Sequence, residues 1–399
     1  MKESLRKLMW VVAAYYFLQG MGGNPGLHVQ ALQKYVKETL QFSPSEAAAL
    51  FAFLTIPWML KPLYGFLSDF LPIFRSRRKS YFILTGSLAV ISYGFLSWFD
   101  ASRNTLFLFL FVAAVGFAFS DVLCDAVMVE KGQPLGATDV LQAAQWGALG
   151  VAGILVAFSK GYLAEYFTLS QALQLSLLFP LAMIVMTAFV LKEESVSSSG
   201  DAAREAWQGL KSAARSKPLW AAAAFLFLFN FSPNLGSVFY YYEKDALKFS
   251  DTLIGHIDTV GAIGFVIGTL FFKMLAKKIS SQALLHAIIA SGVVSTLLYL
   301  FFKGPVSAFA VTAIASVVNV TAFIGILTIA AKICPKHAEG TVFAVLMSLL
   351  NAGTQLGSIV GGKLYEHAGY SWLVIISAVF TAGMWFFTPL MRQKKDSQA

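Results

Sequence analysis

The chain alternates long apolar stretches with short polar connections over almost its entire length. Each stretch reaches about 20 residues, the length that an α-helix needs to cross the hydrocarbon core of a bilayer. The stretches are continuous rather than alternating residue by residue, which argues against a transmembrane β-barrel. The pattern predicts an all-α membrane protein with twelve spans, at residues 8–31, 46–70, 80–99, 105–131, 138–162, 169–192, 217–243, 251–276, 282–302, 305–333, 339–364 and 370–391.

Composition agrees with this pattern. Hydrophobic residues make up 57% of the 399 residues and charged residues only 13%, whereas soluble domains carry about 25% charged residues. The net charge of +9 is what a membrane protein acquires from basic loops, so it predicts no nucleic-acid partner. The only partners expected from this pattern are the lipid bilayer and a small cargo.

Lysine and arginine are unevenly shared between the two ends of the spans. One set of ends includes both termini, the basic run at 75–79 and the connection at 192–217. The opposite ends carry only Lys34, Lys37, Arg103, Lys160, Lys244, Lys248 and Lys303. Because basic loops stay in the cytoplasm, the distribution predicts that both termini are cytoplasmic.

A polar, serine-containing connection at residues 193–216 divides the chain. It predicts an N-terminal six-helix bundle at 1–192, a cytoplasmic linker with a short amphipathic helix, and a C-terminal six-helix bundle at 217–399. The bundles are related as repeats, since 161–165 (Gly-Tyr-Leu-Ala-Glu) aligns with 362–366 (Gly-Lys-Leu-Tyr-Glu). Six-plus-six parallel repeats indicate the major facilitator fold.

Two matching spans contain helix-breaking residues. The first is interrupted at residues 20–26 and the seventh, its counterpart, at 230–236, each by glycine, asparagine and proline. Broken helices at equivalent places in two halves mark binding sites in transporters, although proline kinks are also common in ordinary membrane helices.

Asp121 and Asp125 lie in the middle of the fourth span and share one helix face, because four residues make slightly more than a turn. Ionisable groups at this depth are costly and usually face a water-filled cavity. Lys61 lies in the second span. The three residues therefore predict a cargo or proton site, and the competing interpretation is an ion pair that only holds two helices together.

Polar side chains from both halves fall near the same depth. With the asparagines of the two breaks, they form the predicted substrate-binding set of Gln19, Asn24, Lys61, Asp121, Asp125, Gln145, Asn230, Asn234, Asn319, Asn351 and Gln355. Each amide taken singly is as well explained by hydrogen bonding between helices. Near the outer end of the eighth span, His256 and Asp258 suggest an outer gate or ordinary surface polarity.

Three blocks then resemble the folate–biopterin transporter family, which lies within the major facilitator superfamily. They are residues 56–69 followed by the basic run, residues 121–130 with Asp121 and Asp125, and residues 334–351. The resemblance implies a bacterial inner-membrane transporter that moves folate or a related pterin by alternating access, coupled to protons. It further implies a cytoplasmic gate made of Gly65, Asp69, Arg77, Arg78 and Glu130.

The resemblance also gives the central charges specific roles. Asp121 and Asp125 could carry the coupling proton, since carboxylates in a dry site readily take one up. They could instead accept hydrogen bonds from the amino-pyrimidinone edge of a pterin. Lys61 is suited to the glutamate carboxylates of a folate.

Other classes of function are less well supported. The sequence has no phosphate-cradling Gly-Lys-Ser/Thr loop, no His-Glu-x-x-His pair and no metal-binding cysteine spacing. We therefore expect no enzyme activity, no cofactor and no metal. We also expect the protein to be a monomer. The alternatives that stay open are a carrier of another anionic or zwitterionic small molecule and a non-transporting membrane assembly factor.

Overall fold

The computed structural model describes residues 2–23, 26–71, 73–74, 76, 78–99, 102–191, 217–276, 280–333 and 339–391. Over these residues the regular structure is helical except for one bridge pair, Ile73 with Ser76. Nine helical stretches in this part of the chain are long and apolar enough to cross a membrane. The last of them, Val345–Pro389, has 45 residues, which is enough for two passes. Asn24, Arg77 and the predicted amphipathic helix lie outside the described residues.

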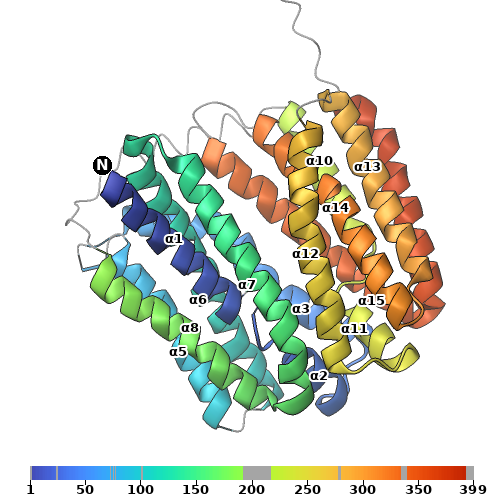
Figure 1. Cartoon of the computed structure of the whole chain (residues 1–399), viewed down its shortest axis with the longest axis horizontal. Helices are drawn as coiled ribbons and strands as arrows, with labels where there is room; N and C mark the ends of the chain where they lie inside the picture. Colours follow the sequence, from blue (N-terminus) through green and yellow to red (C-terminus); the bar gives the residue numbers. More distant parts are fainter. Residues whose placement is uncertain are drawn as a thin grey trace, which may run out of the picture. The chain divides into compact units, whose positions relative to one another are not determined.

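The first six predicted spans appear as helices α1 to α8 (Figure 1). Their bounds are α1 Lys2–Gly22, α2 Val29–Lys34, α3 Pro44–Met59, α4 Lys61–Phe70, α5 Lys79–Trp98, α6 Arg103–Gly132, α7 Thr138–Tyr166 and α8 Leu169–Val190. Two short turns accompany them, the π-helix Tyr35–Thr39 and the 3₁₀ helix Gln133–Leu135. The second span is thus two helices, since the chain leaves helical geometry at Leu60.

The remaining spans begin at Lys217. Their helices are α10 Lys217–Phe231, α11 Val238–Tyr241, α12 Asp251–Ala276, α13 Ser281–Leu298, α14 Pro305–Ile333 and α15 Glu339–Gly383, with a π-helix at Tyr242–Ala246 and 3₁₀ helices at Tyr299–Phe301 and Met384–Met391. Gly369 interrupts α15 with φ 79° and ψ 177°. That interruption lies between the two spans predicted at 339–364 and 370–391.

Both predicted helix breaks are present. After α1 the chain turns at Gly26, whose φ is +74°, and Tyr93 donates to the carbonyl oxygen of Gly22 at 3.0 Å. After α10 the backbone nitrogen of Asn234 donates to the carbonyl oxygen of Gly357 at 3.2 Å. Backbone groups that the broken helices leave unpaired are therefore satisfied by neighbouring helices, as membrane burial requires.

The two breaks lead into a repeated segment that the hydrophobic pattern of the sequence does not reveal. Residues 35–43 read Tyr-Val-Lys-Glu-Thr-Leu-Gln-Phe-Ser and residues 242–250 read Tyr-Glu-Lys-Asp-Ala-Leu-Lys-Phe-Ser. Both begin as a five-residue π-helix. Both then turn through a left-handed residue, Gln41 with φ 54° and Lys248 with φ 57°. A shared sequence with a shared backbone path supports the internal repeat independently of hydrophobicity.

The chain divides into two compact units. One contains Met1–Phe42, Phe53–Ala203 and Phe249–Ala262, and the other contains Ser43–Ala52, Arg204–Lys248 and Ile263–Ala399. In the first unit α1 packs against α7, and α5 packs against both α6 and α8 (Figure 1). In the second, α10 and α13 pack against α15, and α13 against α14. The first unit includes the beginning of α12, and the second includes the beginning of α3.

Small residues allow these helices to approach closely. A Cβ atom added to Gly116 on α6 would lie 2.5 Å from the carbonyl oxygen of Thr85 on α5, and one added to Gly353 on α15 would lie 2.5 Å from that of Phe227 on α10. Close backbone approach is the usual substitute for a hydrophobic driving force between helices in lipid.

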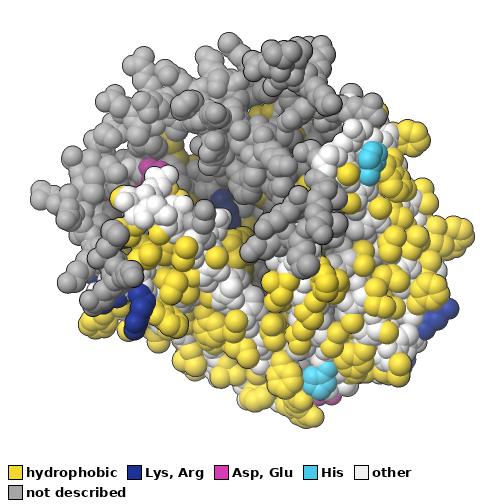
Figure 2. Space-filling view, turned by 45° about the horizontal axis from the view of Figure 1, so that its top comes forward, with side chains coloured by type: hydrophobic (Ala, Val, Ile, Leu, Met, Phe, Trp, Pro, Cys, Tyr) yellow, Lys and Arg dark blue, Asp and Glu magenta, His cyan; other side chains and the backbone are white. Residues whose placement is uncertain are grey.

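Large apolar side chains cover much of the protein surface. Ile91, Phe189 and Val379 are all more than 60% exposed, and the described residues on the face in Figure 2 are mostly hydrophobic with few charged groups. Such a surface would aggregate in water but is suited to contact with lipid acyl chains.

Gly116→Val should destabilise the first unit, because the added side chain must push α5 and α6 apart at a backbone carbonyl. Overpacking of this kind costs about 1–3 kcal/mol, so the thermal unfolding temperature of the detergent-purified protein should fall. Gly153→Ala is the matched control, since nothing lies within 4 Å of its added Cβ. Equal unfolding temperatures for the two variants would contradict the close approach of α5 and α6.

Candidate functional site

The acidic pair of α6 lies on the face that packs against α1 and α7. Asp121 is buried and Asp125 is half-buried, four residues further along the helix. A carboxylate inside a helical membrane protein must find donors or a cation, because hydrocarbon supplies neither. Both aspartates do so, with separate partners.

Asp121 is held by two side chains from other helices. Lys61, at the start of α4, places Nζ 2.5 Å from Oδ2, and Gln19 near the end of α1 donates from Nε2 to Oδ1 at 2.9 Å. The side chain of Asp121 is 6% exposed and that of Lys61 is 31% exposed. The lysine Nζ also lies 4.9 Å from the centre of the Trp58 ring, so the cation contacts both a carboxylate and an aromatic face.

Asp125 has neutral partners. The hydroxyl of Tyr16 donates to Oδ1 at 2.6 Å, and Nε2 of Gln145 donates to the same oxygen at 3.3 Å. Gln145 also lies 3.5 Å from the sulfur of Cys124. Among the described residues no group donates to Oδ2 of Asp125, which leaves one carboxylate oxygen available.

These six residues from α1, α4, α6 and α7 are called the central polar cluster: Tyr16, Gln19, Lys61, Asp121, Asp125 and Gln145. Five of them belong to the predicted substrate-binding set, and the hydroxyl role of Tyr16 was not predicted. The cluster holds two carboxylates and one ammonium group. It is therefore one positive charge short of neutrality when both carboxylates are ionised, and one added proton balances it.

Aromatic rings border the cluster. Trp146 follows Gln145 on α7, is 53% exposed, and lies 6.5 Å from Tyr16 between ring centres. Planar rings beside a charged group are the surroundings that an aromatic, polar cargo requires.

The predicted polar residues of the second half all lie in the second unit and carry no charge. Asn230 donates to the carbonyl of Leu226 within its own helix at 2.8 Å. Asn234 donates to the carbonyl of Thr354 on α15 at 3.0 Å, so its side chain pins the break after α10. Asn319 on α14 is exposed, and Asn351 and Gln355 on α15 are half-buried.

A second group of polar and charged side chains includes three residues of the predicted cytoplasmic gate. It is called the inner charge cluster and consists of Ser68, Asp69, Arg78 and Glu130. Nη2 of Arg78 contacts Oδ1 of Asp69 at 2.6 Å and also contacts Glu130, while Nη1 donates to Ser68 at 2.6 Å. Burial alone would lower the pKa of Arg78, but Glu130 and Asp69 outweigh it and raise that pKa above its usual value. The guanidinium stays charged and links α4 to α6.

Gly65 lies on α4 one turn before this cluster, and a Cβ added there would make an ordinary 3.7 Å contact with Val122. Arg77 and Asn24 lie outside the described residues, so their predicted roles stay predictions.

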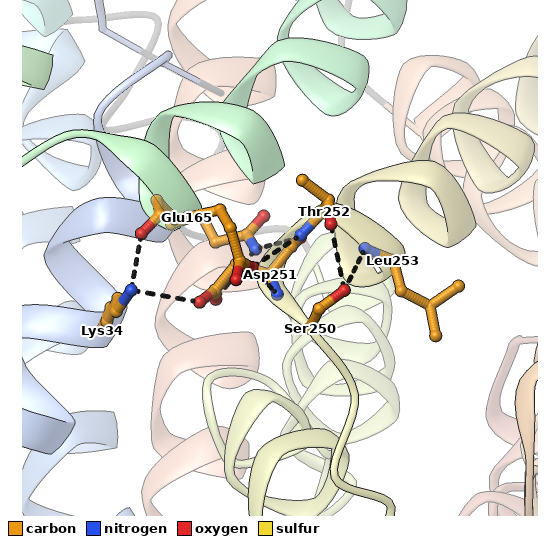
Figure 3. A network of polar contacts seen from close by, with 8 residues as sticks. Lys34, Glu165, Ser250, Asp251, Thr252 and Leu253 are labelled. Carbon is orange, nitrogen blue, oxygen red and sulfur yellow. Dashed lines mark hydrogen bonds and ion pairs between the residues drawn. The ribbon is translucent and has the colours of Figure 1, made fainter.

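A third polar network was not predicted as a whole. It joins Lys34, Glu165 and Asp251 (Figure 3), and Gln30 donates to Asp251 as well. Asp251 lies on α12, the helix that also carries the suggested outer-gate residue His256. The repeated segment at 35–43 and 242–250 was the sequence signal that could have found it, because Asp251 directly follows the second copy. In the part of the chain that the structure describes, no three His, Cys, Asp or Glu side chains are placed to hold a metal ion.

Comparison with solved structures identifies the fold. The chain superimposes on a mutant form of the nucleoside transporter NupG with a TM-score of 0.78, over 96% of this chain and 100% of that one, at 14% identity. The protein thus has the major facilitator fold, and its long apolar helices fit the class of multi-pass membrane proteins.

The sequence comparisons give the family. Residues 19–385 match the BT1 family, and the chain belongs to it. It is 28% identical to the folate-biopterin transporter of Synechocystis sp., over 90% of this chain and 74% of that one. It is 30% identical to the probable folate-biopterin transporter 2 of Arabidopsis thaliana, over 92% and 78%.

Breaking one side of the Lys61–Asp121 pair should cost more than removing both sides. Lys61→Met leaves a buried carboxylate without its cation, which costs about 3–5 kcal/mol, and the thermal unfolding temperature should fall sharply. The double variant Lys61→Met/Asp121→Asn should recover most of that loss.

The matched control is Lys160→Met, because the partner of Lys160, Asp258, is 36% exposed and such pairs contribute about 1 kcal/mol or less. If the double variant instead loses the sum of the two single losses, the two residues do not act as a buried pair.

Proposed function

We propose that this protein is a secondary transporter that moves folate or a related pterin across a membrane by alternating access, coupled to protons. The observation that carries the proposal is the central polar cluster, in which one of two neighbouring carboxylates, Asp121, binds a lysine and the other, Asp125, has neutral partners. The names of its relatives in Synechocystis and Arabidopsis support the choice of cargo, and the fold supports alternating access.

The cluster offers matching chemistry to a folate. The amino-pyrimidinone edge of a pterin presents two parallel N–H donors, which suit a carboxylate such as Asp125 with one unused oxygen. The glutamate carboxylates of a folate are anions and suit Lys61. The rings of Trp58 and Trp146 offer faces for the pteridine and benzoyl groups.

The same geometry supplies a way to couple cargo to protons. When an anionic cargo binds Lys61, it competes with Asp121 for the single ammonium group. The two aspartates then gain negative surroundings, which favours uptake of a proton on one of them. Cargo and proton would therefore bind together and leave together, which is the requirement for symport.

We further propose that the inner charge cluster is the cytoplasmic gate and that Arg77 belongs to it. Asp69 and Glu130 compete for Arg78, which is only 5% exposed, whereas each acid is 45% exposed. A buried guanidinium with solvent-facing partners can exchange them when helices move. The basic residues around it favour a cytoplasmic location, with both termini on that side of a bacterial inner membrane, and we propose a monomer as the transporting unit.

Asp125→Asn should abolish proton-driven accumulation of labelled folate in proteoliposomes, because the amide cannot carry the proton. Exchange of labelled for unlabelled folate without a gradient should continue at lower affinity, because the amide oxygen of asparagine can still accept one of the two pterin hydrogen bonds. The measurement is uptake with and without an inward proton gradient, and Glu38→Gln, a change at an exposed surface carboxylate, is the control.

Gradient-driven accumulation by the Asp125→Asn variant at the unaltered rate would refute proton coupling through this residue. Absence of uptake of any pterin by the unaltered protein would refute the cargo and favour another anionic or zwitterionic molecule. Absence of transport of any such molecule would favour a membrane assembly factor.

Glu130→Gln should shift the balance between inward-facing and outward-facing states without removing cargo binding, because it weakens one of the two acid contacts of Arg78. A charge-assisted hydrogen bond of this type contributes about 1.5–3 kcal/mol. Folate affinity of the purified variant, measured by calorimetry, should stay within about threefold of the parent, while the uptake rate changes. Complete loss of binding would place Glu130 in the cargo site instead.

A further inference from the structure

The beginning of α12 is capped by a carboxylate from a distant helix. Oε2 of Glu165, near the end of α7, accepts hydrogen bonds from the backbone nitrogens of Asp251 at 2.7 Å and Thr252 at 3.4 Å (Figure 3). The first N–H groups of a helix have no partner within it, and the helix dipole favours a negative charge there. Glu165 lies 86 residues away in the sequence, so this cap joins two elements rather than stabilising one.

A lysine and a glutamine reinforce this contact. Lys34 on α2 donates to the carbonyl of Ala164 at 2.8 Å and lies 3.5 Å from Oδ2 of Asp251. Gln30 donates to the carbonyl of Asp251 at 2.8 Å. The carboxylate of Asp251 is 1% exposed, and Lys34 supplies the positive charge that makes its burial tolerable.

The backbones of α7 and α12 also touch beside the cap. A Cβ added to Gly161 would lie 2.6 Å from the carbonyl oxygen of Asp251 and 3.0 Å from Cα of Gly255. Two glycines facing each other allow this distance and no larger residue does. The helices are therefore shaped for contact at this end, and Glu165 lies one turn beyond the contact.

The second unit contains the same arrangement with other residues. Oε1 of Glu366 accepts a hydrogen bond from the backbone nitrogen of Ser45 at 2.8 Å, and Oε2 accepts one from its hydroxyl at 3.0 Å. Ser45 is the second residue of α3, and Glu366 is 321 residues away. A Cβ added to Gly362 would lie 2.8 Å from Cα of Ser45.

The two arrangements follow the repeat. Gly161 and Glu165 correspond to Gly362 and Glu366, and each capped helix begins directly after Phe-Ser, at Phe42-Ser43 or Phe249-Ser250. The same contact has thus been kept twice with the roles of the two sequence halves exchanged.

We propose that Glu165 and Glu366 are positioning residues of the transport cycle that hold the outer side closed by capping helices α12 and α3. The inference rests on the proposed alternating access, in which the sequence halves separate on the outer side. Both repeated segments belong to the set of span ends that carries fewer basic residues in total, which predicts that both caps lie on the outer side. Opening must break both caps, because each joins a helix of one half to a helix of the other.

The two caps are unequal. The first includes the buried Asp251 and its lysine, whereas the corresponding position of α3 is Pro44, which carries no charge. Glu366 is exposed, so water competes for its hydrogen bonds and solvent screens its charge. The Glu366 cap should therefore be the weaker one and should open first.

The test measures opening directly rather than transport. Two buried alanines serve as reporter positions, each replaced by cysteine. Ala157→Cys lies on α7 beside the first cap, since the carbonyl oxygen of Ala157 lies 3.1 Å from a Cβ added at Gly255. Ala48→Cys lies on α3 beside the second cap, one turn after Ser45. They are introduced separately into a Cys334→Ser background in nanodiscs. For each reporter, the rate of labelling by a polar maleimide is measured with and without the glutamate substitutions. The labelling rate of the Cys334→Ser protein that lacks the reporter cysteine is subtracted from each value.

Glu165→Gln and Glu366→Gln should each raise the labelling rate of the reporter on their own capped contact by about 1.7-fold to fivefold, the factor to which loss of a negative charge of ~0.3–1 kcal/mol at a helix start corresponds. The double variant should raise it further at both. Glu46→Gln is the matched control, because Glu46 accepts a hydrogen bond from the backbone nitrogen of Ser43 at 2.9 Å at the same helix start. This contact joins residues of one helix start and not two distant helices. The control should therefore leave the labelling rates of both reporters unchanged.

Parental labelling rates in the double variant, or an equal increase with Glu46→Gln, would overturn the proposal. Both variants keep the shape of the side chain, and thermal unfolding of each confirms that it is folded. Should the protein fail to transport any pterin, the labelling rates still decide whether the caps control opening, so the two proposals fail separately.

Discussion

The ion pair between Lys61 and Asp121 is the interaction on which the rest of the central polar cluster depends. A buried carboxylate without its cation would be strongly unfavourable, and an isolated lysine at that depth would be no better. Once the pair is formed, Gln19 completes the hydrogen bonding of Asp121. Asp125 has hydroxyl and amide donors on one oxygen, and among the described residues no group donates to its other oxygen. Each carboxylate of the cluster thus has its own partners from other helices.

Helix ends away from the central polar cluster also need polar partners from other helices. The membrane leaves no backbone group to be satisfied by lipid, so each broken or terminating helix needs a partner from the protein. Tyr93 and Asn234 satisfy the breaks of α1 and α10 by contacts within their own units. Glu165 and Glu366 satisfy helix starts from the opposite half of the sequence. The first kind of contact stabilises a break within one half of the sequence, and the second kind joins helices from both halves of the sequence.

The inner charge cluster also shares one group among several partners. One buried guanidinium, Arg78, serves two exposed acids on different helices. Because Asp69 and Glu130 are both solvated, losing either contact is tolerable, whereas losing the arginine would leave both acids and Ser68 without their shared donor. A contact that can be partly released suits a gate better than a fully buried pair would.

The approximate positions of the long apolar spans, the two helix breaks and the family can be predicted from the sequence alone, which also offers the pairing of Lys61 with the acidic pair of α6 as one of two interpretations. These follow from periodicity, from the cost of burying charge and from residue-specific motifs, all of which are local or belong to one segment. Only the tertiary structure decided that Tyr16 and Gln145 bind Asp125, that Asn234 pins a break, and that Glu165 and Glu366 cap distant helices. Those facts depend on which rotation each helix adopts against its neighbours, and a nearly uniform apolar helix carries too weak a pattern to reveal it.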